Sequence, residues 1–528
     1  MPGKTEESRQ TIKNSVGRAV LVAISVLLQV FWIVLLVMRL NQYYAYISLA
    51  TSVLSFLVVL HICGNKINAA YKLSWIVLIQ FMPILGLCLF LMFGKESSNA
   101  VMRRRFGRID QQMPRYLPQD EATAARLDAE NPGLGNQAHY LRNTAGFPVY
   151  GDTRVTFYGD TNEALEAQKA ELRKAEHFIF MEYHAIEDST AWRGLEEILA
   201  EKAAAGVDVR VFYDDMGSIG FISKPFARRL QAQGIQCRVF NPLVPVLNVF
   251  MNNRDHRKIV VIDGKVAYTG GLNISNEYMN VEMQNNRFKY WKDNAIRIQG
   301  SSIQNLTKLF LEDWNIQVKK KHFKDSYNSI DDFEKYLHQD YPTFDCDGMI
   351  IPYGDDASNK RDIAENVYIH IISTAKKYLY ITTPYMVIDN QLMDALIFAA
   401  NRGVDVKVIV PSVPDHMITF YIGKTFLKTL VQEGVQVYLY QKGFIHAKTF
   451  ISDDIVSTVG SVNLDYRSLF HHFECGAVLY NCQIIEKIKN DFTETLHDCS
   501  KMTLSDYKKI PIFYRMIART LRIFAPLM

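Results

Sequence analysis

The sequence of 528 residues predicts an α/β protein with a duplicated domain, in which mixed sheets are flanked by helices, and with transmembrane helices at the N-terminus. Three observations predict this fold. Long apolar runs without charge fill the N-terminal end. After residue 151, short apolar segments alternate with helical ones, as in proteins whose helices cover a parallel or mixed sheet. The same alternation returns with the same motif in the C-terminal half, which indicates an internal repeat.

The composition sets limits on the class of protein. Apolar residues make up 48% of the chain and aromatic residues 12%, which is enough for a large core and for membrane segments. The length suggests two or three domains. The net charge is only +4, so the chain is not a general polycation and no nucleic-acid partner is expected. The seven cysteines form no C-x-x-C pair, which indicates reduced, buried thiols and neither a disulfide framework nor a zinc ribbon.

Residues 1–95 are predicted to form a membrane region. It contains three apolar runs, at 19–38, 46–63 and 73–94. About twenty apolar residues cross a hydrocarbon layer of roughly 30 Å, so the first and third runs are long enough and the second is marginal. A cleaved signal peptide would have a shorter apolar core and a cleavage site of small residues. A soluble domain rarely holds three such runs in succession.

Residues 96–150 are predicted to be a basic flank followed by a linker. The flank carries a cluster of arginines between 103 and 115, which indicates a cytoplasmic position and suits anionic lipid headgroups at about 1 kcal/mol per residue. Because the N-terminal tail is basic as well, three crossings would leave one basic flank outside. We therefore expect a multi-pass membrane protein with two full crossings and with the rest of the chain on the cytoplasmic side.

Two α/β domains are predicted, at 151–330 and 331–502. In the first, helices alternate with strands, and the elements are expected at 163–175, 177–183, 192–205, 207–213, 224–233 and 235–240. In the second, a strand at 378–382 precedes a helix at 390–401. The segment RGVDVKVIVPS of the second domain matches AGVDVRVFYDD of the first, and EGVQVYLYQ matches QGIQCRVFN. These matches support a duplicated domain.

Each domain contains one copy of the motif H-x-K-x4-D-x6-G-[GS]-x-N. Its members are His256, Lys258, Asp263, Gly270, Gly271 and Asn273 in the first copy, and His446, Lys448, Asp453, Gly460, Ser461 and Asn463 in the second. Positions i and i+2 of a strand share a face, so the histidine and lysine of each copy point into one site. The aspartate then begins a turn, DG in the first copy and DD in the second.

Pairing the two copies by pseudo-symmetry would give one cleft with two imidazoles, two ammonium groups and two amides, which suits a phosphodiester. The lysines, with Asn273, Asn463 and Ser461, would contact the phosphate and neutralise the charge that builds on its oxygens. One histidine can attack phosphorus and form a phosphohistidine. The other can protonate the leaving alkoxide and then deprotonate the incoming hydroxyl. No metal or cofactor is required, since the protein supplies the positive charge.

Simpler interpretations compete for some of these residues. A single histidine on a strand is more often a satisfied core residue than a catalyst. Lysine, however, is almost never fully buried without a partner, so two H-x-K strands argue against a purely structural role. His471 and His472 have no ligand set at zinc spacing around them, and we interpret them as a polar segment beside the second motif.

The duplicated motif resembles the HKD signature of the phospholipase D superfamily. Other segments look like bacterial cardiolipin synthases, and they are YDDMG at 213–217, the residues around each motif at 252–278 and 443–469, WKDNAIRIQG at 291–300, LEDWN at 311–315 and TPYMV at 383–387. The order of parts, membrane segments followed by two HKD domains, is similar too. The resemblance covers nearly the whole chain and implies a duplicated phospholipase D-like fold in a bacterial cell membrane, with cytoplasmic catalytic domains.

This resemblance also implies an activity. Phosphatidylglycerol would be both donor and acceptor of a phosphatidyl group, and cardiolipin and glycerol would form without a cofactor. One active-site triad would be His256, Lys258 and Asp263, and the other His446, Lys448 and Asp453. Glu474 matches a glutamate that the family often has after its second motif, where it could orient a histidine. Gly271 departs from the signature, which commonly has serine there, so the two halves need not contribute equally.

Residues 503–528 are predicted to form a basic amphipathic tail. Its segment 512–524 could lie in the interface of an anionic membrane or cap the soluble core. No protein partner is indicated.

Other functions stay open on the motif alone. The first alternative is a phospholipase D-type phosphodiesterase that hydrolyses phospholipid, which differs from a transferase only in the hydroxyl that enters the second step. A nuclease would need a basic groove, against the near-balanced charge of the chain. A non-catalytic membrane scaffold would have no use for paired lysines.

Overall fold

The computed structural model describes residues 44–65, 68–90, 117–223, 225–242, 253–281, 288–316, 329–337, 339–346, 348–356 and 361–527, with isolated positions between 24 and 34. The predicted apolar run at 19–38 and the arginine-rich flank therefore lie largely outside the described residues. Within the described part, no helix combines the length and apolarity needed to cross a membrane.

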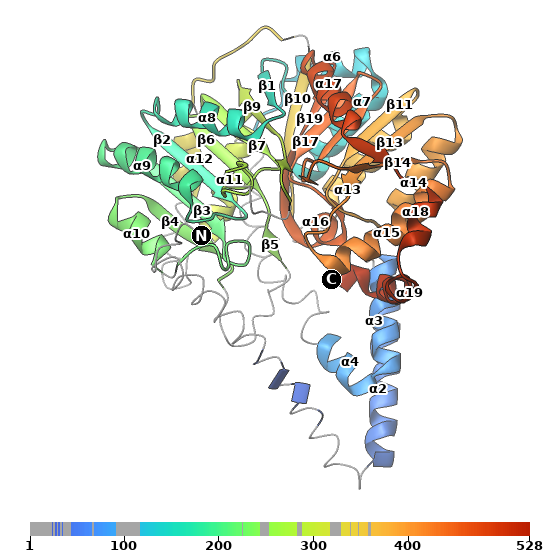
Figure 1. The fold of residues 1–528 in the computed structure, drawn as a ribbon. Helices are drawn as coiled ribbons and strands as arrows, with labels where there is room; N and C mark the ends of the chain where they lie inside the picture. The colour runs from blue at the N-terminus through green and yellow to red at the C-terminus, as the bar shows by residue number, and fades with distance from the viewer. Residues whose placement is uncertain are drawn as a thin grey trace.

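Three helices form the described N-terminal region, and they are α2 (Tyr44–Gly64), α3 (Ala69–Phe81) and α4 (Pro83–Leu89). The third predicted apolar run is divided between α3 and α4, because Pro83 lacks the N–H that would continue the helix. Ile62, Trp75 and Ile79 form a small core between these helices. The Ser74 hydroxyl donates to the carbonyl of Ile523 at 2.6 Å, which fixes α3 to the C-terminal end of the chain (Figure 1).

The predicted linker is wrong for residues 121–145, which form two helices. They are α6 (Glu121–Glu130) and α7 (Pro132–Ala145), and each begins at a side-chain cap, Asp120 for α6 and Asn131 for α7. Their apolar residues Leu127, Leu134 and Leu141 are buried in the main core. The helical spacing of these leucines is weak in a stretch rich in Gly, Asn and Gln, which is why the sequence favours a linker there.

The first half contains a seven-stranded mixed sheet in the order β1-β9-β7-β6-β2-β3-β4. Its strands are β1 (Arg154–Tyr158), β2 (Phe178–Tyr183), β3 (Asp208–Asp214), β4 (Gln236–Phe240), β6 (Lys258–Ile262), β7 (Val266–Gly270) and β9 (Ala295–Gln299). β2, β3 and β4 pair in parallel and the other pairs are antiparallel. The helices of this half are α8 (Thr161–Leu172), α9 (Thr190–Ala204), α10 (Phe226–Ala232), α11 (Ile303–Ile316) and α12 (Ser329–Leu337).

The second half repeats this sheet strand for strand. Its main path is β10-β19-β17-β16-β11-β13-β14, extended by β20. These strands are β10 (Met349–Asp355), β11 (Tyr378–Thr382), β13 (Asp405–Pro411), β14 (Gln436–Tyr440), β16 (Thr449–Ser452), β17 (Val456–Gly460), β19 (His472–Tyr480) and β20 (Cys499–Lys501). Each pairing has the same sense as its counterpart in the first sheet. The α/β architecture with mixed sheets and an internal repeat is thereby confirmed.

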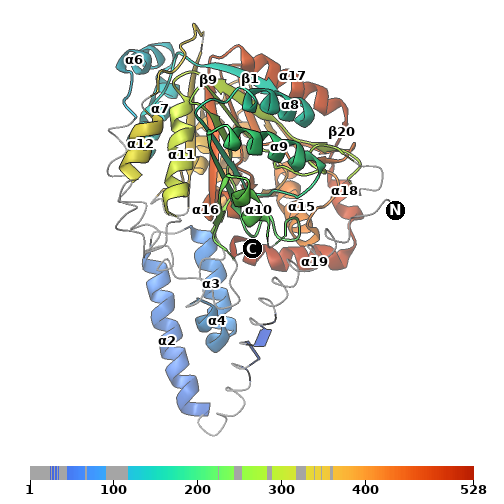
Figure 2. The same ribbon diagram turned by 90° about the vertical axis from the view of Figure 1, so that its left-hand side faces the viewer.

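Helices cover the outside of both sheets, and the two halves meet along the middle of the molecule (Figures 1 and 2). The helices of the second half are α13 (Ile363–Thr374), α14 (Asn390–Asn401), α15 (Met417–Gln432), α16 (Tyr466–Phe470) and α17 (Ile484–His497). One core cluster contains residues of both halves, including Phe180 and Phe310 of the first and Ile351 and Val478 of the second. The halves therefore share a core, and the positions of the two sheets are fixed by packing.

The tail contains α18 (Leu504–Lys509), α19 (Ile512–Leu521) and the 3-10 helix η7 (Arg522–Leu527). α19 packs beside α15, where Tyr514 stacks on Tyr421 with ring centroids 4.9 Å apart. Arg522 turns toward the second half and donates to the carbonyl of Thr425 at 3.3 Å. The outward face of α19 is apolar, so the tail both caps the second half and presents an apolar surface.

Candidate active site

The two motif histidines lie just before equivalent strands, and each is tied to the other half of the molecule. The short strand β5 (Arg254–Asp255) pairs with the start of β19, and the backbone N–H of His256 donates to the carbonyl of Phe473 at 2.8 Å. In the mirror arrangement, β15 (Phe444–Ile445) pairs with β8 (Trp291–Lys292), and the N–H of His446 donates to Lys292 at 2.7 Å. The repeat thus brings both histidines to the junction of the halves.

The carboxylates that orient these histidines are exchanged between the halves. Nδ1 of His256 lies 2.9 Å from Oε1 of Glu474, and Nδ1 of His446 lies 2.7 Å from Oδ2 of Asp293. Glu474 lies near the start of β19, Asp293 lies two residues before the equivalent strand β9, and both are fully buried. A carboxylate on Nδ1 fixes the tautomer that leaves Nε2 as the reactive nitrogen. Each histidine therefore depends on a side chain from the opposite repeat.

The motif lysines are buried beside the histidines, as the spacing predicts. The Lys258 ammonium donates to the carbonyl of His256 at 2.5 Å, and the Lys448 ammonium donates to the carbonyl of His446. Burial lowers the pKa of Lys448 to about 7 and also lowers the pKa of Lys258. A bound anion would favour the charged form of both, so the pair is suited to a phosphate.

Burial and the nearby ammonium groups also keep the imidazoles neutral. The pKa of His446 falls to about 4, from burial first and the charge of Lys448 second. The pKa of His256 is lowered well below its usual value by burial, Lys258 and Lys448. A neutral imidazole with a free Nε2 is the form that attacks phosphorus or accepts a proton.

The motif aspartates are not brought to the histidines. Asp263 lies beyond the far end of β6, in the hairpin turn that leads to β7, and its carboxylate accepts the backbone N–H groups of residues 176, 177 and 178, each at 2.8 Å. Asp453 accepts the equivalent groups of residues 376, 377 and 378 at 2.7 to 2.9 Å. Both aspartates have positive φ, 52° and 56°, as the turn requires. The geometry assigns them to holding the start of β2 and β11, in place of the triads expected from the resemblance.

The remaining predicted residues surround the paired histidines. The Asn273 amide donates to the Tyr278 hydroxyl at 3.1 Å, and its oxygen accepts the N–H of Ala185. Asn463 is buried and hydrogen-bonds to Asp465. The Ser461 hydroxyl donates to the Glu474 carboxylate. It therefore helps to hold the carboxylate that orients His256, and it is not placed as a phosphate contact.

The departure at Gly271 follows from the geometry. A β-carbon at this position would lie 2.2 Å from Oδ1 of Asp293. In the second half the equivalent space holds Ser461, and the longer Glu474 reaches its histidine past the serine hydroxyl. In one half the shorter Asp293 lies beside Gly271, and in the other the longer Glu474 lies beside Ser461. Either combination places a carboxylate at hydrogen-bond distance from Nδ1 of a histidine.

Four further site residues were not identified from the sequence, and they are His184, Tyr278, Asp293 and His472. In the sequence, the segment that contains Asp293 stands out only through the family resemblance. Asp293 reaches His446 because β8 pairs with β15, and the residue spacing within one motif does not predict this pairing. Tyr278 lies with its hydroxyl 3.5 Å from Nε2 of His446. His472, interpreted from the sequence as part of a polar segment beside the second motif, also lies beside the first motif, with its ring 5.5 Å from that of His256. His471, in contrast, packs against Tyr71.

Two groups of described residues have the donor spacing of a metal site. The first contains His256, His472 and Glu474, and the second contains Glu182, Asp255 and Asp313. In the first group, Nδ1 of His256 and Oε1 of Glu474 already lie 2.9 Å apart, at hydrogen-bond distance from each other. In the second, the Arg257 guanidinium bonds Asp313 at 2.8 Å, and burial raises the pKa of Glu182 well above its usual value. A neutral carboxyl and a paired carboxylate suit a structural role under the site.

Comparisons with known proteins agree on one family. A family model described as cardiolipin synthase, PLD-like domain, matches residues 169–314 and 368–496, and a model described as phospholipase D-nuclease N-terminal matches 53–95. A cardiolipin synthase of Staphylococcus aureus is 32% identical over 86% of this chain and 91% of its own length. A cardiolipin synthase of Halalkalibacterium halodurans is 30% identical over 86% and 88%.

Two further matches bear on the fold and the extent of the chain. An uncharacterized protein of Streptococcus mutans is 38% identical over 89% of this chain and 99% of its own length. The crystal structure of a phosphatidylserine synthase of Haemophilus influenzae superposes with a TM-score of 0.56, covering 74% of this chain and 98% of that one. At 16% identity, that likeness speaks for the fold alone.

Proposed function

This chain belongs to the cardiolipin synthase family of phospholipase D-like proteins, and from that membership we propose that it is a membrane phosphatidyltransferase that condenses two phosphatidylglycerol molecules into cardiolipin and glycerol. The observation that carries the proposal is the cross-paired site. His256 with Glu474 and His446 with Asp293 stand beside two buried lysines. This arrangement supplies a nucleophile, an acid–base group and positive charge for a phosphodiester.

In the first step, Nε2 of one histidine attacks phosphorus of the donor lipid. The N–P bond forms and the P–O bond to the headgroup glycerol breaks. The other histidine takes up a proton at Nε2 when the anionic phosphodiester binds, because a nearby negative charge favours the imidazolium, and it gives this proton to the leaving alkoxide. Lys258 and Lys448 neutralise the nonbridging oxygens as their charge grows. The products are free glycerol and a phosphatidyl-histidine.

In the second step, a hydroxyl of a second phosphatidylglycerol attacks the phosphatidyl-histidine. The histidine that acted as acid now takes the hydroxyl proton, the new P–O bond forms and the N–P bond breaks. Cardiolipin leaves and both imidazoles return to their starting state. Water in place of the lipid hydroxyl would give phosphatidic acid, which is the hydrolase alternative.

We further propose that the protein sits in the cell membrane as a multi-pass protein, with its α/β halves on the cytoplasmic side. Support comes from the large apolar side chains that α2 exposes, among them Leu49, Phe56 and Leu57 at 66%, 59% and 55% exposure. The outward face of α19 lies at the same end of the molecule (Figures 1 and 2). Exposed apolar surface of this extent marks a membrane or partner contact.

The decisive experiment gives the purified full chain phosphatidylglycerol as its sole lipid and analyses the products by mass spectrometry. Cardiolipin with an equal amount of glycerol is expected. Phosphatidic acid with glycerol, and no cardiolipin, would establish hydrolysis and refute the transferase.

The two-histidine mechanism has its own test. His256→Ala and His446→Ala should each abolish turnover. His177→Gln is the matched control, because His177 is exposed, and this variant should keep full turnover. Brief reaction with phosphorus-labelled lipid followed by acid-free denaturation should trap the phosphoenzyme on one histidine only. Full activity in either alanine variant would refute the mechanism.

A further inference from the structure

A pocket opens beside the second motif, between the carboxyl end of β13 and helix α15. Its lining residues are largely apolar or aromatic, and they include Tyr385, Met386, Val413, Phe420, Leu427 and Phe444. The space that the centres of water-sized molecules can reach is about 30 Å³, and all the empty space, including the open mouth, is about 350 Å³. Phe444 forms one end, and its ring centroid lies 6.3 Å from that of His446. The pocket therefore adjoins the candidate active site without including its histidines.

The pocket contains an ammonium group without an ion-pair partner, and within the part of the chain that the structure describes the only acidic side chain that acts on its charge is the more distant Asp506. Lys424 of α15 is only 7% exposed, and its Nζ lies 4.7 Å from the ring centroid of Phe420. In the described residues, Nζ has no carboxylate within ion-pair distance and no hydrogen-bond acceptor. Burial lowers the pKa of Lys424 to about 8. Burying a charged group without a partner is costly, which points to a partner that arrives from outside.

The other buried lysines of the described chain show the contrast. These are Lys258 and Lys448, which donate to backbone carbonyls, and Lys308, whose Nζ lies 3.6 Å from Oε1 of Glu312. Lys424 alone among them lines a pocket with only an aromatic face beside it. The wall also holds one carboxylate, Asp415, which accepts the Tyr385 hydroxyl. The pocket thus offers a cation for a phosphate and an acceptor for headgroup hydroxyls.

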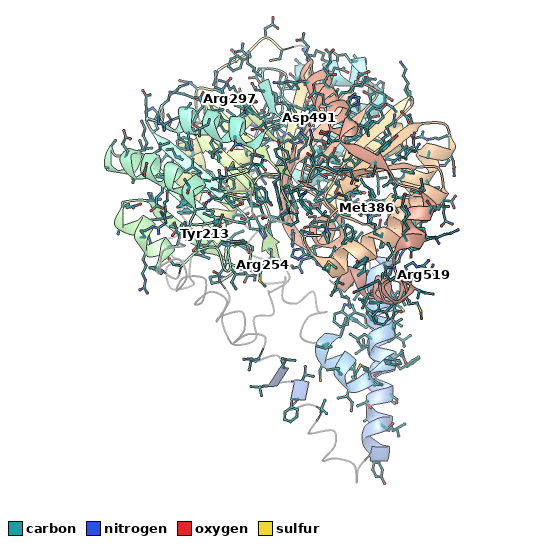
Figure 3. The ribbon with its side chains drawn as sticks, in the orientation of Figure 1. Tyr213, Arg254, Arg297, Met386, Asp491 and Arg519 are labelled. Carbon is teal, nitrogen blue, oxygen red and sulfur yellow. The ribbon has the colours of Figure 1, made fainter. Side chains whose placement is uncertain are left out.

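The mouth of the pocket lies on an apolar surface. Met417 and Ile418, at the start of α15, are 51% and 55% exposed, and Thr419 and Phe420 follow directly into the lining. α19 continues this surface with Ile512, Phe513 and Met516, which are 61% to 67% exposed. Figure 3 labels Met386 of the pocket and Arg519 of α19, which lies below it in that view. Acyl chains can leave the pocket along this surface while a phosphate stays inside.

We propose that this pocket binds the acceptor phospholipid, with its phosphodiester on Lys424 and its headgroup hydroxyls toward Asp415 and the active site. The proposal rests on the proposed function, which places the donor phosphate between the histidines and their lysines. A phosphate on Lys424 must then belong to a second lipid. Only the second step, in which that lipid attacks, should depend on this contact.

The first test is kinetic and uses the full chain in mixed micelles. Lys424→Met should raise the phosphatidylglycerol concentration needed for half-maximal cardiolipin formation at least tenfold. Release of glycerol in a single turnover should stay within twofold of the parent. Methionine suits the apolar wall, so thermal stability should not fall. Lys428→Met, one turn along the same helix and beside Tyr507, is the matched control and should leave both steps unchanged.

Two kinetic results would overturn the proposal. One is an unchanged dependence of cardiolipin formation on lipid concentration in Lys424→Met. The other is an equal loss of glycerol release, because this would place Lys424 in the first step. If the parent protein itself makes no cardiolipin, the proposed function fails, and binding at Lys424 is then read by the second test alone.

The second test is binding without turnover. The protein is treated with an amine-acylating reagent, and modification of Lys424 and Lys428 is quantified by peptide mass spectrometry. Short-chain phosphatidylglycerol should reduce modification of Lys424 at least fivefold and leave Lys428 unchanged, whereas diacylglycerol should protect neither. Inorganic phosphate at the same concentration should not protect. Equal protection by inorganic phosphate would reduce the site to a general anion site, and no protection by the lipid would refute it.

Discussion

Replacing Asp263 by alanine tests whether this motif residue holds the fold or acts in the reaction. Its carboxylate accepts three backbone N–H groups at 2.8 Å. Hydrogen bonds to a charged group are worth about 1.5–3 kcal/mol each. Residues 176 and 177 are exposed, so water replaces much of two of these bonds, but the N–H of Phe178 is buried and would be orphaned. Alanine at a positive φ adds about 1 kcal/mol.

We therefore expect Asp263→Ala to lower the free energy of unfolding by about 4 kcal/mol, while the folded fraction keeps its turnover. Urea unfolding followed by tryptophan fluorescence reports on this half, which contains Trp192 and Trp314. Asp453→Ala should cost less, because Asp453 is only half-buried whereas Asp263 is buried, so water replaces more of the hydrogen bonds of Asp453. Lys265→Ala, in the same turn and exposed, should stay within about 0.5 kcal/mol of the parent. Unchanged stability of Asp263→Ala with a hundredfold loss of turnover would refute the structural role.

Three more predictions concern the cross-paired site. Glu474→Gln and Asp293→Asn should each lower turnover about 100-fold or more, because each variant loses the carboxylate that fixes the tautomer of a histidine. Turnover is measured by a steady-state assay in micelles, and unchanged turnover would show that the assignment is wrong. Gly271→Ser should also lower turnover, although it restores the commoner signature, because its side chain collides with Asp293; an active variant would contradict the packing argument. The pKa of His446 is about 4 in the folded protein and about 6.5 in the unfolded chain, so the unfolded chain binds more protons between these pH values. The free energy of unfolding should therefore fall as the pH drops from about 6.5 to about 4 and level off below that, with a total loss of at most about 3 kcal/mol. Melting curves of the parent and His446→Asn should differ in this slope, and identical slopes would contradict the shift.

The sequence was sufficient for the repeat, the mixed sheets and the convergence of His256 with His446. These follow from periodicity and spacing, which report local backbone geometry and the side of a strand. It was not sufficient for Asp293 or His472, because their roles depend on pairing between β8 and β15 and between β5 and β19. Such pairings join segments from different halves, and neither carries a local signal.

The aspartates show the opposite failure. Asp263 and Asp453 belong to the motif, and the resemblance placed them in the active site. Their turn was predicted correctly from the dipeptides DG and DD. Because this turn lies at the far end of the strand from the histidine, both aspartates lie away from the site. Lys258 is the first residue of the five-residue strand β6, and Asp263 follows its last residue in the hairpin turn. A shared motif therefore combines two residues for the reaction with one for the fold, and spacing alone does not separate them.

The exchange of carboxylates between the halves also sets when the enzyme can first work during its synthesis. Glu474 lies on β19, 218 residues after His256, so it is made much later than the histidine that it orients. A nascent or truncated chain that stops before this strand holds an imidazole without its partner. A ribosome-bound chain, or a fragment left by a protease, that lacks β19 is therefore expected to leave the surrounding phospholipids intact, and lipid chemistry begins only after this strand has been made and has paired with β5.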